Sequence, residues 1–81
     1  MVLKVGDRFI HAETGELYEI TAISEHQHFV NMKYRGPNHY DWIVIADPKP
    51  YNFIEWCIRD RRYIPDTPAG RVLYEAGKRK I

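Results

Sequence analysis

Apolar and polar residues alternate along the first third of the chain, in two runs that a short polar stretch separates. Phe9 lies in the first run, at residues 7–12, and Ile20 lies in the second, at residues 16–24. Successive side chains of a strand point to opposite faces, so such alternation indicates one buried and one wetter face. Between the runs, Gly15 can take the positive φ that a tight turn requires. The pattern predicts a β-hairpin.

Two more strands are predicted after this hairpin. Residues 28–34 alternate again and place Val30 and Met32 on an apolar face. The turn signal at residues 35–39 then leads into residues 42–46, which are apolar at every position. A strand of that kind is covered on both faces, and we expect the C-terminal segment to cover its outer side.

The pattern breaks at Pro48 and Pro50, which exclude a central strand and a helix interior. Residues 51–62, which follow, fit a helix and a strand almost equally well. We favour a short helix that begins near Asn52, whose side chain would cap it, and then a last strand at residues 61–64. An all-strand interpretation of the stretch stays open.

A helix is predicted at the C-terminal end of the chain. Thr67 before Pro68 is a typical start, because a cap residue then precedes a proline at the first helical position. The helix would run over residues 69–80, weakened by Gly70 and Gly77 by roughly 1 kcal/mol each relative to alanine. Its narrow apolar stripe would consist of Val72, Leu73 and Ala76, with Tyr74 on one edge.

Together these elements predict a mainly β protein with a C-terminal helix. Eighty-one residues allow one domain. We divide it into a small, strongly bent five-stranded barrel at residues 1–64 and a basic helical tail at residues 65–81. The tail would pack on the barrel or extend from it. Residues 1–5 form a short apolar lead that would add an edge strand or close the barrel.

The hairpin carries a pattern of glycine, acidic and apolar residues. It consists of Gly6, Asp7, Phe9, Thr14, Gly15, Tyr18 and Ile20, in the stretches GDRF and TGELYEITAI. Over residues 5–64 the chain resembles the small SH3-like barrel proteins often encoded by bacteriophages and prophages. The resemblance implies an SH3-like barrel, and it implies no catalytic residue, because that group has no common active site.

The charges are distributed unevenly, although the net charge is only +1. Residues 1–58 hold five Lys and Arg against eight Asp and Glu, whereas residues 59–81 hold seven against three. A basic C-terminal third indicates either a solvated helix or an anionic partner. Cys57 is the only cysteine, and no apolar run is long enough to span a membrane. Residues 1–9 also lack the apolar region of a signal peptide, so we expect a cytoplasmic protein without a membrane partner.

No catalytic motif is recognised, since the chain has no nucleophile elbow, phosphate-binding loop or dinucleotide-binding glycine pattern. Cys57 lies between two apolar residues and is typical of a buried thiol. His26 and His28 would share a strand face if the third strand begins before them, but two imidazoles are fewer than the ligands that a firm metal site needs. We therefore predict no enzyme activity, no cofactor and no metal.

Aromatic and basic side chains are the candidates for binding. Flat rings near loops stack on proline, on nucleobases or on a partner protein, and arginines beside them contact phosphates. Trp42 and Phe53 are assigned to the core. The predicted binding residues are Tyr34, Tyr40, Tyr51, Trp56, Arg59, Arg61 and Arg62.

The first functional hypothesis is a non-catalytic binding module that docks on another protein, as a phage-type factor that modulates a host component. Either the C-terminal tail or a second copy of the chain, in a homodimer, would cover the apolar fourth strand. The alternative is a nucleic-acid-binding barrel that uses its aromatic residues and the basic C-terminal third. A third hypothesis is a small-ligand or metal site at the histidines.

Overall fold

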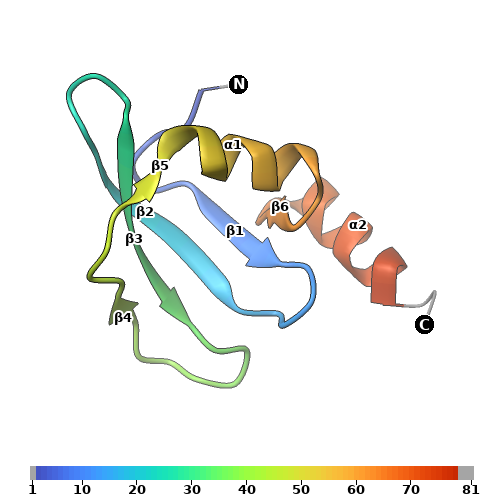
Figure 1. The fold of residues 1–81 in the computed structure, drawn as a ribbon. Coiled ribbons are helices and arrows are strands. Elements are labelled where there is room, and N and C mark those ends of the chain that lie inside the picture. Colours follow the sequence, from blue (N-terminus) through green and yellow to red (C-terminus); the bar gives the residue numbers. More distant parts are fainter. Residues whose placement is uncertain (1, 79–81) are drawn as a thin grey trace.

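A six-stranded antiparallel sheet and two helices make up the fold (Figure 1). The structure is a computed structural model that describes residues 2–78. Its elements are β1 (Arg8–His11), β2 (Leu17–Ile23), β3 (Phe29–Arg35), β4 (Ile43–Val44), β5 (Lys49–Pro50), α1 (Tyr51–Arg59), β6 (Tyr63–Pro65) and α2 (Pro68–Lys78). The strand order is β4-β3-β2-β1-β6, and β5 pairs with β3 as β4 does.

The predicted hairpin is present as β1 and β2. Phe9 of β1 lies opposite Tyr18 of β2, and Gly15 in the turn between them has a φ of 76°. Gly6, just before β1, has a φ of 95° and reverses the chain there. Glycine adopts this left-handed region without steric cost, so both turns use the residue that the sequence provides.

A register shift in β2 changes which face its last residues occupy. Ile20 lies opposite Met32 of β3, yet the next paired residue is Ala22, which lies opposite Asn31. The extra residue between them bends the strand, as β-bulges do, and returns Ile23 to the side of Ile20. The uninterrupted alternation expected for this strand is therefore wrong at its end.

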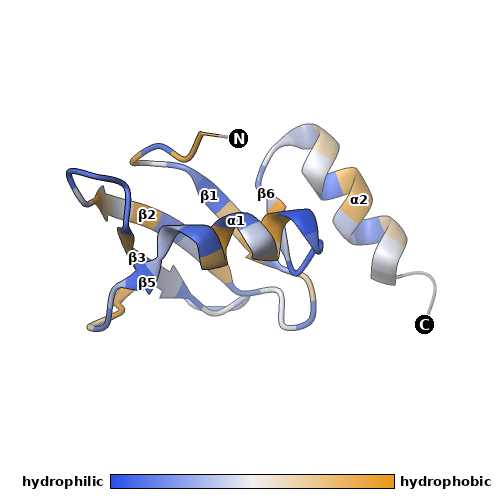
Figure 2. Cartoon of the chain, turned by 45° about the horizontal axis from the view of Figure 1, so that its top comes forward, coloured by the Kyte–Doolittle hydropathy of each residue, from blue (hydrophilic) through white to orange (hydrophobic). Residues whose placement is uncertain are grey.

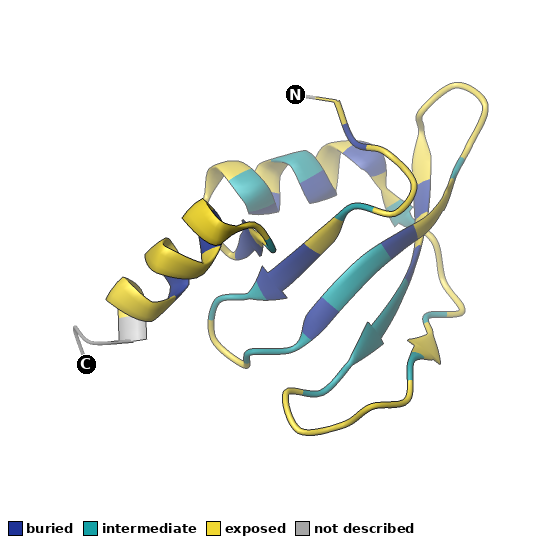
Figure 3. Cartoon of the chain, turned by 180° about the vertical axis from the view of Figure 1, so that it is seen from behind, coloured by how far each residue is buried: buried dark blue, intermediate teal, exposed yellow. Residues whose placement is uncertain are grey.

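Both faces of the sheet are buried in part, because a helix packs on each of them (Figure 3). Phe9 faces α1 and its neighbour Ile10 faces α2, so the expectation of one buried and one wetter face is wrong for β1. The larger core, under α1, consists of Leu3, Phe9, Ile20, Val30, Met32, Tyr51, Ile54, Cys57 and Tyr63. The smaller core, under α2, consists of Ile10, Leu17, Ile64 and Tyr74.

The stretch after the two prolines forms α1, which confirms the helical interpretation over the all-strand one. Tyr51, Ile54 and Cys57 recur at helical spacing and form its buried side, and apolar and polar positions alternate along it in Figure 2. The expected cap at Asn52 is wrong. Pro50 is the N-cap residue, and no side chain makes a capping hydrogen bond at this end of the helix.

The tail helix α2 begins where the sequence predicts, with Thr67 as its cap. The N–H of Gly70 donates to Thr67 Oγ1 at 3.1 Å, and Pro68 is the first helical residue. The buried side of α2 carries Gly70 and Tyr74. The expected apolar stripe is therefore wrong, since its three members are exposed: Val72, Leu73 and Ala76. The predicted end of the helix at residue 80 lies outside the described residues.

The apolar run at residues 42–46 is not covered on both faces. Only Ile43 and Val44 form β4, at one edge of the sheet, and Val44 is 75% exposed. The helix α2 packs against β6, which is the opposite edge. The prediction of a covered fourth strand is wrong, because β4 has a single neighbouring strand and the C-terminal segment lies elsewhere.

The expectation of a mainly β fold with a C-terminal helix is confirmed, but the sheet is not closed. Among the described residues β4 and β6 are its two ends, so the closed barrel expected from the sequence is not observed. Residues 2–5 form no strand. Instead Leu3 inserts into the larger core, and its N–H donates to Tyr51 Oη at 2.9 Å. Neither helix within residues 2–78 has the length and apolar character needed to cross a membrane.

Candidate binding surfaces

The structure separates the seven predicted binding residues into three places. Tyr51 lies in the larger core with 6% of its surface exposed, so its assignment to a binding surface is wrong. Its ring points inward because Tyr51 begins the buried side of α1. Tyr34 and Tyr40 lie at one end of the sheet, beside the β3–β4 loop. The other four lie on the second half of α1 or in the turn after it: Trp56, Arg59, Arg61 and Arg62.

An open groove of about 650 Å³ lies between the β1–β2 turn, the end of β3 and the β3–β4 loop. Tyr34 and Tyr40 line it together with Pro37, and Tyr40 is 89% exposed. Glu16 and Asp41 line the same groove. We call it the Tyr34–Tyr40 groove. It joins two of the predicted binding residues to two carboxylates that the sequence did not single out for binding.

The β3–β4 loop owes its shape to Gly36. The N–H of His39 donates to the carbonyl of Gly36 at 3.2 Å, which closes a turn through Pro37 and Asn38. The His39 ring folds back so closely that an ideal Cβ on Gly36 would lie 2.6 Å from its Cδ2 atom. Pro37 in turn lies 3.6 Å from the position of an ideal Cβ on Gly15. The two loops that border the groove thus lie close together.

A row of tyrosine rings continues from the groove across the sheet. Tyr34 of β3 stacks on Tyr18 of β2, with 6.0 Å between ring centroids and 29° between planes. Tyr18 stacks on Tyr63 of β6 at 5.2 Å and 24°, and His11 of β1 lies 5.8 Å from Tyr63. Aromatic pairs of this kind add roughly 0.5–1.5 kcal/mol each beyond the area they bury. The row holds Tyr34 in one orientation.

The charge lining the groove is negative. Thr14 Oγ1 donates to Glu16 Oε1 at 2.9 Å and accepts the Glu16 N–H at 3.2 Å, which orients this carboxylate. Burial and, next, the negative charge of Glu16 raise the pKa of Tyr18 to about 12, so the Tyr18 hydroxyl stays protonated beside the groove. Asp41 adds a second carboxylate, and the described lining contains no Lys or Arg. The groove therefore suits a partner that carries positive charge.

A second surface, the α1 surface, consists of Phe53, Trp56 and the charged residues that follow. The rings of Phe53 and Trp56 are 6.3 Å apart on the outer side of α1, and Trp56 is 47% exposed. The assignment of Phe53 to the core is wrong, because α1 buries its other side. The guanidinium of Arg62 lies 4.7 Å from the Trp56 ring and pairs with Asp60 at 2.8 Å. This carboxylate offsets part of the positive charge predicted for the region.

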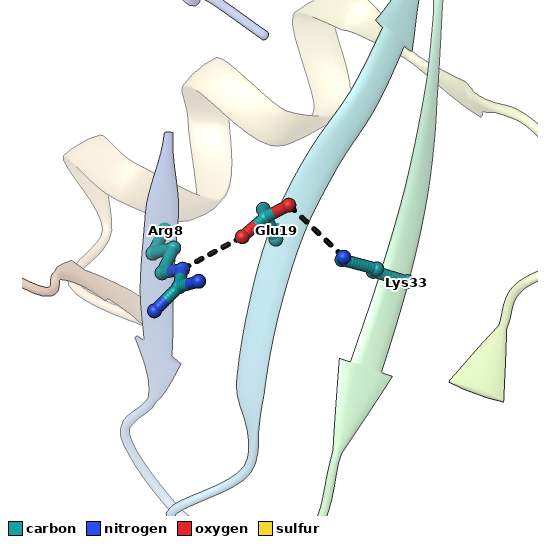
Figure 4. A network of polar contacts seen from close by, with 3 residues as sticks. All are labelled: Arg8, Glu19 and Lys33. Carbon is teal, nitrogen blue, oxygen red and sulfur yellow. Dashed lines mark hydrogen bonds and ion pairs between the residues drawn. The ribbon is translucent and has the colours of Figure 1, made fainter. Parts of the chain in front are cut away.

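A third surface, which we call the Trp42 cluster, lies on the face of the sheet opposite α1. Lys33 Nζ lies 4.9 Å from the Trp42 ring centroid, and the guanidinium carbons of Arg8 and Arg35 lie 5.3 and 5.2 Å from it. Glu19 stands between Arg8 and Lys33 and pairs with them at 2.7 and 3.3 Å (Figure 4). Trp42, assigned to the core from the sequence, is half-buried: it packs against the smaller core and also lies among charged side chains.

The strand register explains how these residues meet. Arg8 lies opposite Glu19, and Glu19 lies opposite Lys33, across three neighbouring strands. Side chains of directly opposed residues share a face, with Cβ atoms roughly 5 Å apart. In the sequence, Arg8, Glu19 and Lys33 belong to three separate alternating runs, and nothing in one run says which residue of another lies opposite. The sequence reasoning missed the cluster because the pairing between strands has no local signal.

Cys57 and the histidines are the remaining groups weighed for chemistry. Cys57 is 2% exposed in the larger core, and burial raises the pKa of its thiol. The rings of His26 and His28 are 6.1 Å apart between β2 and β3. Within residues 2–78, no group of three or more His, Cys, Asp or Glu side chains is placed to hold a metal ion.

No family model, curated protein or solved structure matches this chain. The resemblance to SH3-like barrel proteins of phages therefore stays a prediction. Function has to be inferred from the chemistry of the Tyr34–Tyr40 groove, the α1 surface and the Trp42 cluster.

Proposed function

We propose that this protein is a non-catalytic binding module whose Tyr34–Tyr40 groove docks on an extended, basic, proline-containing segment of another protein. The observation that carries the proposal is the composition of the groove. Two tyrosines and a proline stand beside two carboxylates, and the described lining has no Lys or Arg. Flat apolar surfaces next to negative charge match proline rings next to Lys or Arg side chains.

The tyrosine and proline surfaces favour a segment in the polyproline II conformation. Such a segment is already extended before it binds, so little conformational entropy is lost on docking. Tyr34 is held by its stacking on Tyr18, so the partner meets a preformed surface. Tyr40 is a nearly fully exposed ring that a bound segment would cover, and aromatic residues of that kind are frequent among binding hot spots.

The carboxylates of Glu16 and Asp41 set the sign of the partner's charge. Negative charge at the margin of a groove steers basic segments toward it and repels acidic ones. Glu16 needs little reorganisation on binding, because Thr14 already orients its carboxylate. Basic residues next to the prolines of the segment would thus pair with Glu16 and Asp41.

The proposal includes the wider identity expected from the sequence. The chain would be a cytoplasmic SH3-like barrel protein of the phage type that modulates a host component through this groove. The GDRF and TGELYEITAI stretches support this identity. The antiparallel succession of β1, β2 and β3 is compatible with it.

Fluorescence polarisation with labelled peptides tests the groove. A basic, proline-containing peptide should bind more tightly than a peptide of the same length with Glu in place of its Lys and Arg. Tyr40→Ala should weaken binding roughly tenfold, as expected for an aromatic hot spot. Asp41→Asn should weaken binding and reduce its salt dependence. Phe29→Ala is the matched control, because it removes a half-exposed ring on β3 outside the groove.

Two results would remove the proposal. One is equal binding of the basic and the acidic peptide. The other is unchanged binding by a Tyr40→Ala protein whose thermal unfolding matches that of the wild type. Nuclease treatment during capture from a host lysate then separates a protein partner from a nucleic-acid one.

A second copy of the chain remains a proposed partner at β4. This edge strand exposes Ile43 and Val44, and exposed edges pair with strands of other chains. Sedimentation at micromolar concentration should show a dimer for the wild type and a monomer for Val44→Lys. A wild type that sediments only as a monomer would exclude this partner and leave the peptide groove untouched.

A further inference from the structure

We propose that the Trp42 cluster binds single-stranded nucleic acid, through its phosphates and through bases stacked on the guanidinium groups of the cluster. The site lies on the other face of the sheet from the Tyr34–Tyr40 groove. Lys33 and Arg35 flank Tyr34 in β3, and neighbouring residues of a strand point to opposite faces. An experiment that excludes binding at one of these sites therefore does not exclude binding at the other.

Three cations converge on one indole ring in the cluster. Lys33, Arg8 and Arg35 all lie within 5.3 Å of the Trp42 ring centroid. Three positive charges thus surround one ring, and an anion that neutralises them binds favourably. The ring and Glu19 already hold these side chains, so less rotamer freedom is lost when a ligand arrives.

The carboxylates near the cluster leave a positive surplus. Glu19 is shared by two of the three cations. Asp66 donates its N–H to the carbonyl of Arg8, but its carboxylate pairs with Arg71 at 2.7 Å. Arg35 takes part in none of the ion pairs formed within the described part of the chain. Arg35 is thus the cation most available to a phosphate.

On the face that carries the cluster, no helix covers the strands between α2 and β4. Figure 3 looks onto this face and shows α2 along one margin, with no helix in front of β2 and β3. The helix packs over Ile10, Leu17 and Ile64. The row from Arg8 to Lys33 crosses strands that lie roughly 10 Å apart, and the side chains of Arg8 and Lys33 at its ends are 48% and 28% exposed. A single extended strand of nucleic acid can follow such a row.

Single-stranded nucleic acid is the ligand that uses both the positive charge and the flat guanidinium groups of the cluster. Guanidinium groups bind phosphate oxygens in a bidentate manner, and their planes stack on unpaired bases. Arg8 contacts Trp42 yet keeps 48% of its side chain exposed, so part of its guanidinium remains available. An acidic peptide would satisfy the charges alone. A duplex keeps its base faces stacked inside and would likewise offer only phosphates.

Fluorescence of Trp42 reports binding once it is the only tryptophan. The Trp56→Phe variant provides this, because the chain has two tryptophans and Trp56 lies on the α1 surface. A single-stranded oligothymidine should change the emission, with an affinity that falls as salt rises. Arg35→Gln should weaken binding severalfold and lower the salt slope by about one. Lys4→Gln makes the same charge change at an exposed residue before β1 and should leave binding as it is.

Two further probes and one second variant complete the experiment. A duplex of the same sequence and a poly-glutamate of equal charge should both bind more weakly than the single strand. Equal binding of either probe would overturn the proposal, as would an equal loss in Arg35→Gln and Lys4→Gln. Lys33→Gln repeats the comparison if Arg35→Gln does not fold. The groove peptide should bind the Arg35→Gln protein as it binds the wild type, which separates failure of this site from failure of the groove.

Discussion

The carbonyl oxygen of Pro65 lies against the backbone of Gly70, so closely that an ideal Cβ on Gly70 would fall well inside van der Waals contact with that oxygen. The first turn of α2 therefore comes down onto the end of β6. This approach places Tyr74 on Ile10 and Leu17 in the smaller core. At Gly70 the lack of a side chain is a packing requirement, and it outweighs the cost of glycine in a helix.

Gly70→Ala should destabilise the protein by roughly 1–3 kcal/mol, because overpacking against the backbone outweighs the gain in helix propensity. Gly77→Ala is the matched control in the same helix. A Cβ at Gly77 would meet nothing within 4 Å, so this change should stabilise the protein by roughly 0.5–1 kcal/mol. Urea unfolding followed by circular dichroism measures both free energies. Stabilisation by both changes would contradict the packing of α2 on Pro65.

The elements that were predictable from the sequence have local signals. Gly15 marks the hairpin turn, and Thr67 before Pro68 marks the start of α2. Layering has no such signal. Alternation indicates that a strand is half-buried, but it does not say how many helices cover the sheet, so one wetter face was expected for β1 although α2 covers Ile10. In the same way, an apolar run does not reveal that Val44 lies on an edge.

The residues of the candidate sites also divide into those with a local sequence signal and those without one. Tyr34 and Tyr40 flank a strong turn signal, so their place beside a loop could be predicted. Tyr51 could not be placed, because the direction of its ring depends on the phase of a helix whose existence was itself ambiguous. The pairing of Arg8 with Lys33 through Glu19 depends on a register between three strands, which only the folded chain specifies.

Stability should fall at acid pH through Glu19. The hydrogen bond from Arg8, with a smaller contribution from Lys33, holds the pKa of the Glu19 carboxyl below its ordinary value of 4.5. A carboxyl whose pKa is lower in the folded state adds stability that is present above the unfolded pKa. That stability is lost as the pH falls through the folded pKa. Glu19→Gln should remove this part of the pH dependence in urea unfolding measured from neutral to acid pH.

Glu25→Gln is the control for this prediction, because it removes an exposed carboxylate between β2 and β3. Its stability should fall toward acid pH as steeply as that of the wild type. Parallel curves for the wild type and Glu19→Gln below pH 4.5 would contradict the ion pairs drawn in Figure 4.

Alkaline pH should act through Tyr18. Burial, followed by the charge of Glu16, raises its pKa from 10.0 to about 12. A tyrosine whose pKa is higher in the folded state contributes stability below the unfolded pKa, and this stability is lost as the pH rises toward the folded one. The free energy of unfolding should therefore decline between pH 10 and about pH 12. Tyr18→Phe should make that decline shallower.

Tyrosinate absorbance during an alkaline titration checks the same group directly. The folded wild type should show a component that ionises late, and Tyr18→Phe should diminish it. Tyr40→Phe, at a ring that is almost fully exposed, should leave the late component in place. A wild type and a Tyr18→Phe protein with the same late component would show that Tyr18 does not carry it.

Cys57 should resist modification for as long as the larger core stays closed. Its thiol is buried in the larger core, so a reagent has little access to it. Burial also raises the pKa of the thiol, so little of the reactive thiolate is present in the folded protein. Alkylation should then require opening of the core, and should be slower than that of an exposed thiol by roughly a thousandfold or more. Iodoacetamide labelling followed by mass spectrometry measures the rate.

The matched control places an exposed thiol on the same helix, as Asn52→Cys in a Cys57→Ala background. Its labelling rate measures the reactivity of an exposed thiol on the same helix, which does not depend on opening of the core. Urea below the unfolding midpoint should accelerate the labelling of Cys57 and leave the control rate nearly constant, because only the first depends on opening. Equal rates for the two thiols in the folded protein would mean that α1 does not stay closed on the sheet, and the layering of both cores would have to be revised.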